Sequence, residues 1–272
     1  MSLLSNISVG CIGIGNMGSA IVTGLARSMD IKSISCYDIE PDRIQDAKRK
    51  SGVRSVDSLE ELCRDSEVII IAVKPDAVPA VLREIAPYIT KKIIVSVAAG
   101  VGLETMESLL PRPAKIVRVM PNTPALVRKG MTVLSPNREM GEESLKMVEE
   151  IFSHLGEVMV LPERFMNAVT GLSGSGPAYI FTMISALADG GVKMGLPRDK
   201  ALVLAAQTAL GSAEMVLSTG EDPMTLRAKV ASPGGTTIEG LHILDRAGFS
   251  GIIMDAVEAA AMRASRLSEK KA

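Results

Sequence analysis

The sequence predicts an α/β chain in which a doubly wound, mostly parallel sheet is followed by an all-helical domain. Short runs of β-branched residues alternate with amphipathic stretches up to Leu161, a glycine-rich turn follows the first run, and strand-like runs end after Pro162. Continuous apolar runs are typical of strands covered on both faces. Their alternation with helical patterns is typical of parallel βαβ units.

The elements of the first part follow from these alternating patterns. Short apolar runs predict strands, and the longer stretches with apolar residues on one side predict the helices between them. The expected strands are 7–12, 34–37, 68–73, 93–97 and 115–119, with 132–135 and 158–161 as further candidates, and the expected helices are 17–28, 41–50, 59–64, 77–88, 103–110 and 142–154.

The second part is rich in Ala, Leu, Met and Gly, which predicts helices over about 177–194, 198–219, 222–230, 234–246 and 248–267. Between Ala201 and Leu217 the only charged residue is Glu214, and a helix that is apolar all round must be buried. We therefore expect a dinucleotide-binding domain over 1–161 and a domain over 162–272 that forms an obligate homodimer. A tight monomeric core is the alternative.

Composition excludes several classes of protein. The 30 Lys and Arg against 31 Asp and Glu give a net charge of −1, which argues against the basic stripe that nucleic-acid binding needs. Three cysteines and two histidines lie far apart, which argues against a metal site or a disulfide scaffold and fits a reducing cytoplasm. The start lacks a secretory pattern, and apolar stretches fall short of a membrane span, so a cytoplasmic protein is expected. With no Trp, three Tyr and four Phe, binding sites must consist of backbone and small side chains.

The first strand leads into a glycine-rich turn that predicts a Rossmann dinucleotide site. Gly13 permits the tight turn, Gly15 lets the backbone approach a pyrophosphate, and Gly18 lets helix and strand pack closely. The helix that follows offers N–H groups to phosphate. Asp38, twenty residues after Gly18, ends the second strand, where its carboxylate would accept hydrogen bonds from a ribose diol. The other residues of this loop are Ile14, Asn16 and Met17.

The nicotinamide cofactor itself is left open between NADH and NADPH. The carboxylate of Asp38 repels a 2′-phosphate and favours NADH, whereas Arg43 and Lys48 on the next helix offer positive charge for NADPH. The alternative for these two basic residues is a solvated helix face. Further cofactor contacts are expected where other strands end, because ligands bind at that edge of a doubly wound sheet. These residues are Val73, Lys74, Pro75, Ala98, Ala99, Gly100 and Asn122.

Two loops in the second part combine hydroxyls, glycines and a following helix. One contains Ser175 before Pro177, and the other runs from Ser232 through Gly234, Gly235, Thr236 and Thr237. Free N–H groups and hydroxyls without charged side chains suit a small carboxylate. An ordinary N-cap is the alternative for each loop.

Taken together, these segments resemble the Δ1-pyrroline-5-carboxylate reductase family over essentially the whole chain. The set in this order is specific, although no single member is. The matching segments are Gly13-Ile-Gly-Asn-Met-Gly18, Ala72-Val-Lys-Pro75, Ser96-Val-Ala-Ala-Gly100, Met120-Pro-Asn-Thr-Pro124, Leu172-Ser-Gly-Ser-Gly-Pro-Ala-Tyr179 and Ser232-Pro-Gly-Gly-Thr-Thr-Ile238.

The resemblance implies hydride transfer from NADPH or NADH to the C=N bond of 1-pyrroline-5-carboxylate, giving L-proline. It implies an interlocked helical homodimer, and often a ring of dimers such as a decamer. It places the substrate carboxylate on the loop from Ser232 to Thr237, the Thr237 hydroxyl on the ring nitrogen, and Ser175 and Asn122 nearby. The candidate loops hold no obvious acid, which suits a substrate that arrives protonated better than an alcohol.

Two other functions remain open from the residues. A β-hydroxyacid dehydrogenase has the same domain plan but needs a lysine on the first long helix of the second domain. Residues 177–189 contain none, and Lys193 comes only near the end of that helix. A non-enzymatic nucleotide-sensing regulator would keep the Rossmann half, but it would not need the serine, glycine and threonine loops.

Overall fold

The structure is a computed structural model that describes residues 7–28 and 30–269. Residues 1–6, over which no secretory pattern is expected, lie outside the described residues. The described chain forms two compact units, residues 7–28 and 30–174 with 259–269, and residues 175–258. The boundary expected between Leu161 and Pro162 stays a prediction.

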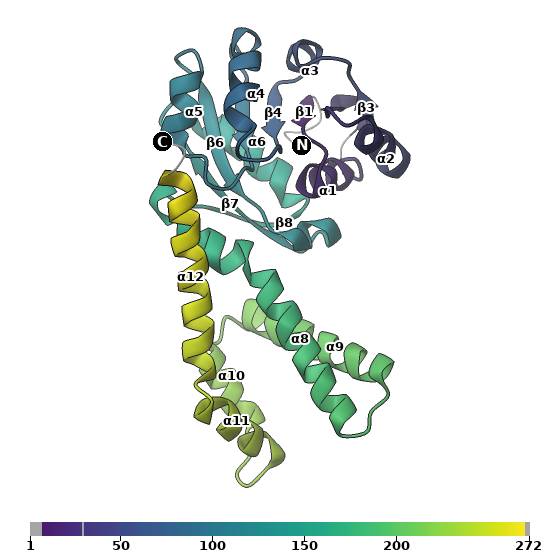
Figure 1. Ribbon diagram of the computed structural model, residues 1–272, viewed down its shortest axis with the longest axis vertical. Helices are drawn as coiled ribbons and strands as arrows, with labels where there is room; N and C mark the ends of the chain where they lie inside the picture. Colours follow the sequence, from purple (N-terminus) through teal and green to yellow (C-terminus); the bar gives the residue numbers. More distant parts are fainter. Residues whose placement is uncertain (1–6, 29, 270–272) are drawn as a thin grey trace. The chain divides into compact units, whose positions relative to one another are not determined.

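The first unit is built on an eight-stranded sheet with the order β3-β2-β1-β4-β5-β6-β7-β8 (Figure 1). Neighbouring strands are parallel except β6 and β7, which are antiparallel. The chain reverses its direction across the sheet at β1, which pairs with β2 on one side and β4 on the other. The strands are β1 (Val9–Ile12), β2 (Ile34–Tyr37), β3 (Arg54–Ser55), β4 (Val68–Ile71), β5 (Ile93–Ser96), β6 (Lys115–Met120), β7 (Gly130–Pro136) and β8 (Gly156–Val160).

Helices cover both faces of this sheet. The α-helices of the unit are α1 (Asn16–Leu25), α2 (Pro41–Ser51), α3 (Leu59–Asp65), α4 (Val78–Ile85), α5 (Leu103–Leu109), α6 (Glu142–Ser153) and α7 (Met166–Val169). Short 3-10 helices occupy Ile31–Ser33, Ala86–Tyr88, Thr123–Val127 and Glu163–Phe165, and a π-helix follows α7 over Thr170–Gly174.

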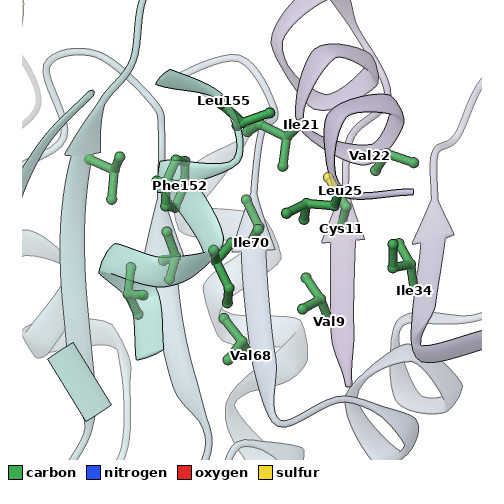
Figure 2. Packing of buried hydrophobic residues seen from close by; sticks show 14 of the residues in the cluster. Val9, Cys11, Ile21, Val22, Leu25, Ile34, Val68, Ile70, Phe152 and Leu155 are labelled. Atoms are coloured by element: carbon green, nitrogen blue, oxygen red, sulfur yellow. The ribbon is translucent and has the colours of Figure 1, made fainter. Parts of the chain in front are cut away.

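Two separate apolar cores explain why the strands read as continuous apolar runs. In β4, Ile70 packs with α1 and α6 on one face, while Ile69 and Ile71 pack with α3, α4 and α5 on the other. Figure 2 shows the first of these cores, in which Leu25 lies near Cys11 of β1 and Phe152 belongs to the helix α6 that packs on the same face. Successive side chains of a strand point to opposite faces, so a strand between two helix layers needs apolar residues at every position.

The three cysteines are free thiols buried in these cores. Cys11 and Cys36 occupy paired positions of β1 and β2, and Cys63 lies on α3. Burial raises the pKa of Cys36 and of Cys63 to about 11, and it raises the pKa of Cys11 still further above its ordinary value. Since the thiolate is the nucleophile, these side chains are inert packing groups.

The second unit consists of helices α8 (Gly176–Lys193), α9 (Arg198–Thr219), α10 (Pro223–Val230) and α11 (Thr236–Arg246), with the first part of α12 (Phe249–Glu269). Small residues let α8 and α9 approach closely around Ala188, Ala201 and Ala205. Tyr179 on α8 donates its hydroxyl to the Ala256 carbonyl at 3.2 Å. These contacts bury only a minor part of the apolar surface of the unit.

Most of the large apolar side chains of α9 face outward. Leu217 is 77% exposed and Val203 is 66% exposed. The expectation that every apolar stretch falls short of a membrane span is wrong for α9, because by length and composition alone this helix could cross a membrane. Only 11% of its most apolar window is buried within the chain. An exposed apolar surface of this extent needs a covering partner.

The thiols offer a direct check on this packing. We expect Cys11, Cys36 and Cys63 in the native protein to react with Ellman's reagent at pH 8 at least about 100-fold more slowly than in urea, because burial and a raised pKa leave almost no accessible thiolate. Absorbance of the released thionitrobenzoate measures the rate. Native reaction of any one thiol at the rate of the unfolded chain would contradict this packing.

Candidate active site

A pocket of about 630 Å³ opens at the carboxyl ends of β1, β2 and β4 in the first unit. Ligands of doubly wound sheets bind at this edge, where the strand order reverses. The pocket is lined by Ile12, Gly13, Gly15, Asn16, Tyr37, Asp38, Ile39, Glu40, Arg43, Leu59, Ala72, Val73, Lys74, Asp76, Ala77, Val81 and Glu84.

The glycine-rich turn has the close contacts that its sequence predicts. Gly13 has a φ of +92°, and a Cβ there would lie 2.8 Å from the Ala72 carbonyl oxygen. A Cβ on Gly18 would overlap the carbonyl oxygen of Gly13, whereas Gly15 faces open space. Helix α1 begins directly after Gly15, which has no side chain to cap it. Its first N–H groups therefore face the pocket with the positive end of the helix dipole, a suitable place for a pyrophosphate.

Asp38 holds this turn in place. Its carboxylate accepts hydrogen bonds from the backbone N–H of Ile14 at 2.6 Å and of Glu40 at 2.9 Å. Arg43 lies 3.6 Å from the same carboxylate, whose side chain is only 3% exposed. The carboxylate thus connects the end of β2 to the turn between β1 and α1, while it also lines the pocket.

Only some of the expected cofactor residues line the pocket in the structure. Gly13, Gly15, Asn16, Asp38, Val73 and Lys74 line the pocket together. The described residues around it do not include Ile14, Met17, Gly18, Pro75, Ala98, Ala99, Gly100 or Asn122. The Ile14 N–H donates to Asp38, and Gly18 packs on the Gly13 carbonyl, so both residues hold the turn without lining the pocket. Ala98 to Gly100 follow strand β5, which pairs with β4.

Sequence reasoning missed one wall of this pocket. Ala77, the N-cap of α4, and Val81 and Glu84 within that helix line it, and Ile39 and Glu40 line it after β2. The spacing 77, 81 and 84 places these three side chains on one face of a helix, a signal that was available in the sequence. What the sequence left undecided was which face of α4 points toward the strand ends.

Asn122 makes two structural hydrogen bonds. Its side-chain oxygen accepts from the Met131 N–H at 2.9 Å, and its amide donates to the Ser173 carbonyl at 3.1 Å. The residue is buried, at 9% exposure. It therefore ties the loop after β6 to β7 and to the π-helix, and one amide N–H is left for any ligand.

The segment before Ser175 differs from a simple helix start. Residues Thr170–Gly174 form a π-helix that runs on from α7, and α8 begins at Gly176 with Ser175 as N-cap. The Ser173 hydroxyl donates to the Val169 carbonyl at 3.1 Å, so it is not directed to a ligand. The expectation of a loop with free N–H groups at a helix start is wrong in part here, because the chain is already helical before Ser175. π-Helical turns are frequent at functional sites.

The second loop, in the other unit, has the form of an anion site. Gly234 has a φ of +66°, and the Gly235 N–H donates to the Ser232 carbonyl at 3.1 Å. Helix α11 begins at Thr236 directly after Gly235, which has no side chain to cap it. The first-turn N–H groups and the hydroxyls of Ser232, Thr236 and Thr237 are thus donors at the positive end of an eleven-residue helix. Among the described residues, no group of three His, Cys, Asp or Glu side chains could hold a metal ion.

Comparison with known proteins gives a consistent result for both halves. Residues 163–267 match the family model for pyrroline-5-carboxylate reductase dimerisation, and residues 8–100 match the model for NADP oxidoreductase coenzyme F420-dependent. The pyrroline-5-carboxylate reductase of Methanosarcina acetivorans is 42% identical, over 98% of this chain and 100% of its own length. The enzyme of Escherichia coli K12 is 41% identical, over 96% and 98%. The Plasmodium falciparum pyrroline carboxylate reductase with NADP bound superposes with a TM-score of 0.88 at 35% identity, covering 97% of this chain and 99% of that one.

A nucleotide-binding sheet followed by a helical dimerisation domain defines an NAD(P)H-dependent oxidoreductase that functions as a homodimer. The chain belongs to the pyrroline-5-carboxylate reductase family. Its reaction is the NAD(P)H-dependent reduction of 1-pyrroline-5-carboxylate in proline biosynthesis. This result decides against a β-hydroxyacid dehydrogenase and against a non-enzymatic regulator. The dimerisation model includes all of α9, the helix whose large apolar side chains are exposed.

Two glycine variants distinguish an effect on the stability of the turn from an effect on cofactor affinity. We expect Gly18→Ala to lower the melting temperature and to weaken NADH binding, because its Cβ overlaps the Gly13 carbonyl. Gly15→Ala has room within the protein, so the melting temperature stays unchanged while NADH binding weakens at least about tenfold through contact with the pyrophosphate. Differential scanning fluorimetry and calorimetric titration measure the two effects. Equal NADH affinity of Gly15→Ala and the wild type would contradict this position of the pyrophosphate.

Asn122→Asp tests the bond to the π-helix. Aspartate still accepts from Met131, but it places a carboxylate oxygen against the Ser173 carbonyl, so we expect about 1–3 kcal/mol of lost stability at pH 7 in urea unfolding. The loss shrinks near pH 4, where a protonated carboxyl can donate. Asn122→Ala, which removes both bonds, serves as the comparison and shows no such recovery. Full stability of the aspartate variant at pH 7 would argue against the Ser173 bond.

Proposed function

We propose that the loop from Ser232 to Thr237 binds the carboxylate of 1-pyrroline-5-carboxylate and that the Thr237 hydroxyl hydrogen-bonds the ring nitrogen. The observation that carries this proposal is the start of α11, where a glycine N-cap leaves N–H donors beside three hydroxyls. The sequence from Ala231 to Ile238 contains no charged side chain, so the helix end and the hydroxyls are the donors available there. Ser175 and Asn122 complete the proposed substrate residues.

The chemistry needs positioning more than it needs a strong acid. A protonated imine carbon is electrophilic, and a bound nicotinamide supplies the hydride that adds to it. The electrons of the C=N bond then remain on nitrogen as the lone pair of the product amine. A hydroxyl at Thr237 can orient the nitrogen and take part in its hydrogen bonding, while the α11 donors fix the carboxylate and hence the face of the ring.

For the cofactor, we propose that the pyrophosphate lies on the first turn of α1 beside Gly13, Gly15 and Asn16. The uncapped start of this helix and the open space at Gly15 support this position. Asp38 would contact the ribose. The nucleotide would also contact Val73, Lys74 and Pro75, which follow β4. Ala98, Ala99 and Gly100, at the end of β5, and Asn122, after β6, would lie toward the nicotinamide, where small side chains leave room for the ring.

The assembly beyond a homodimer and the compartment are also proposals. A ring of dimers such as a decamer is supported by the family resemblance alone. A cytoplasmic location is supported by three buried cysteines that remain thiols, which suits a reducing compartment.

Thr237 is tested by a pair of variants. We expect Thr237→Ala to lower kcat/KM for 1-pyrroline-5-carboxylate by about 10- to 100-fold, because the nitrogen loses its hydrogen-bond partner, and Thr237→Ser to retain most of the activity. NADH oxidation at 340 nm measures the rate, and titration with NADH alone serves as the control for an intact cofactor pocket. Wild-type kinetics in Thr237→Ala would remove this hydroxyl from the mechanism.

A further inference from the structure

The charges around the nucleotide pocket are unequal. Its described lining includes four carboxylates, from Asp38, Glu40, Asp76 and Glu84, but only two cations, from Arg43 and Lys74. NADPH differs from NADH by one phosphate on the adenosine ribose, and a phosphate monoester carries about −1.5 to −2 charges at pH 7. The pocket therefore opposes the group that distinguishes the two cofactors.

Asp38 is the carboxylate that cannot move away. Two backbone N–H groups hold it, from Ile14 and Glu40, and its side chain is almost fully buried. Each carboxylate oxygen can accept a further hydrogen bond, so ribose hydroxyls can still donate to it. A 2′-phosphate has no proton to donate in its dianionic form, and it would face a fixed negative charge.

Arg43 offsets only part of the negative charge that a 2′-phosphate would meet in this pocket. Its guanidinium lies 3.6 Å from the Asp38 carboxylate and is half exposed, so its charge is already shared with Asp38 and with solvent. Lys48, the second cation that the sequence offers for a 2′-phosphate, is not among the described residues that line the pocket. A phosphate bound by Arg43 would have to compete with Asp38 for it.

We infer that this reductase uses NADH in preference to NADPH, with Asp38 as the residue that sets the selectivity and Arg43 as the contact through which NADPH still binds. The inference rests on the proposed position of the nucleotide in this pocket. It also gives Asp38 a second role, because the same carboxylate positions the glycine-rich turn through Ile14. Selectivity and the shape of the phosphate site are thereby linked through one side chain.

The test measures the dissociation constants of NADH and NADPH by calorimetric titration of the full-length protein, without the imine. We expect the wild type to bind NADH at least about tenfold more tightly, and Asp38→Asn to shift the ratio of the two constants at least about tenfold toward NADPH. Arg43→Ala weakens NADPH about fivefold or more and leaves NADH within about twofold. Lys48→Ala, the matched control outside the pocket, leaves the ratio unchanged.

Because Asp38→Asn leaves one acceptor oxygen for the two N–H groups of Ile14 and Glu40, Glu40→Gln provides a second variant. The exposed Glu40 side chain lines the same pocket, and its neutralisation shifts the ratio about two- to threefold toward NADPH without disturbing the turn. Equal or tighter binding of NADPH by the wild type, or an unchanged ratio in both carboxylate variants, overturns the inference. Absence of binding by either cofactor overturns it together with the proposed nucleotide position. Binding without imine reduction contradicts only the proposed substrate site.

Discussion

The hydrogen bond from the Ile14 N–H to the Asp38 carboxylate is the contact on which the nucleotide site depends. It joins the end of β2 to the turn between β1 and α1, two segments that only the parallel pairing of β1 and β2 brings together. The turn it fixes has its tightest contacts at glycines, where Gly18 packs on the Gly13 carbonyl. A buried carboxylate is costly unless it is hydrogen-bonded, and here the bonds that satisfy it also shape the phosphate-binding backbone.

The helical half depends on a different constraint, which is the burial of its apolar surface. A single chain buries small residues between α8 and α9 but leaves side chains such as Leu217 in solvent. The family relationship supplies the missing partner as a second copy of the chain. The sequence therefore encodes a helical unit that a homodimer would complete.

Sequence reasoning worked best where local geometry dictates residue type. The glycine-rich turn is set by close backbone contacts, and the apolar strands are set by burial on two faces. Both patterns can therefore be recognised in the sequence alone. The two-residue strand β3 carries too little apolar signal to be predicted. The roles of Asn122 and of the π-helix were missed for another reason. An asparagine between two prolines suits a ligand as well as it suits the Met131 N–H and the Ser173 carbonyl, which are distant in sequence.

By itself the sequence determined the class of fold, the phosphate-binding turn, the helical second half and the family, because each depends on residue type at fixed local spacing. Only the tertiary structure decided how Asp38 is held, that Arg43 rather than Lys48 lines the pocket, and which face of α4 forms its wall. These depend on directions that side chains take after strands pair and helices dock. A sequence records which charges exist, whereas the folded chain decides which of them face one another.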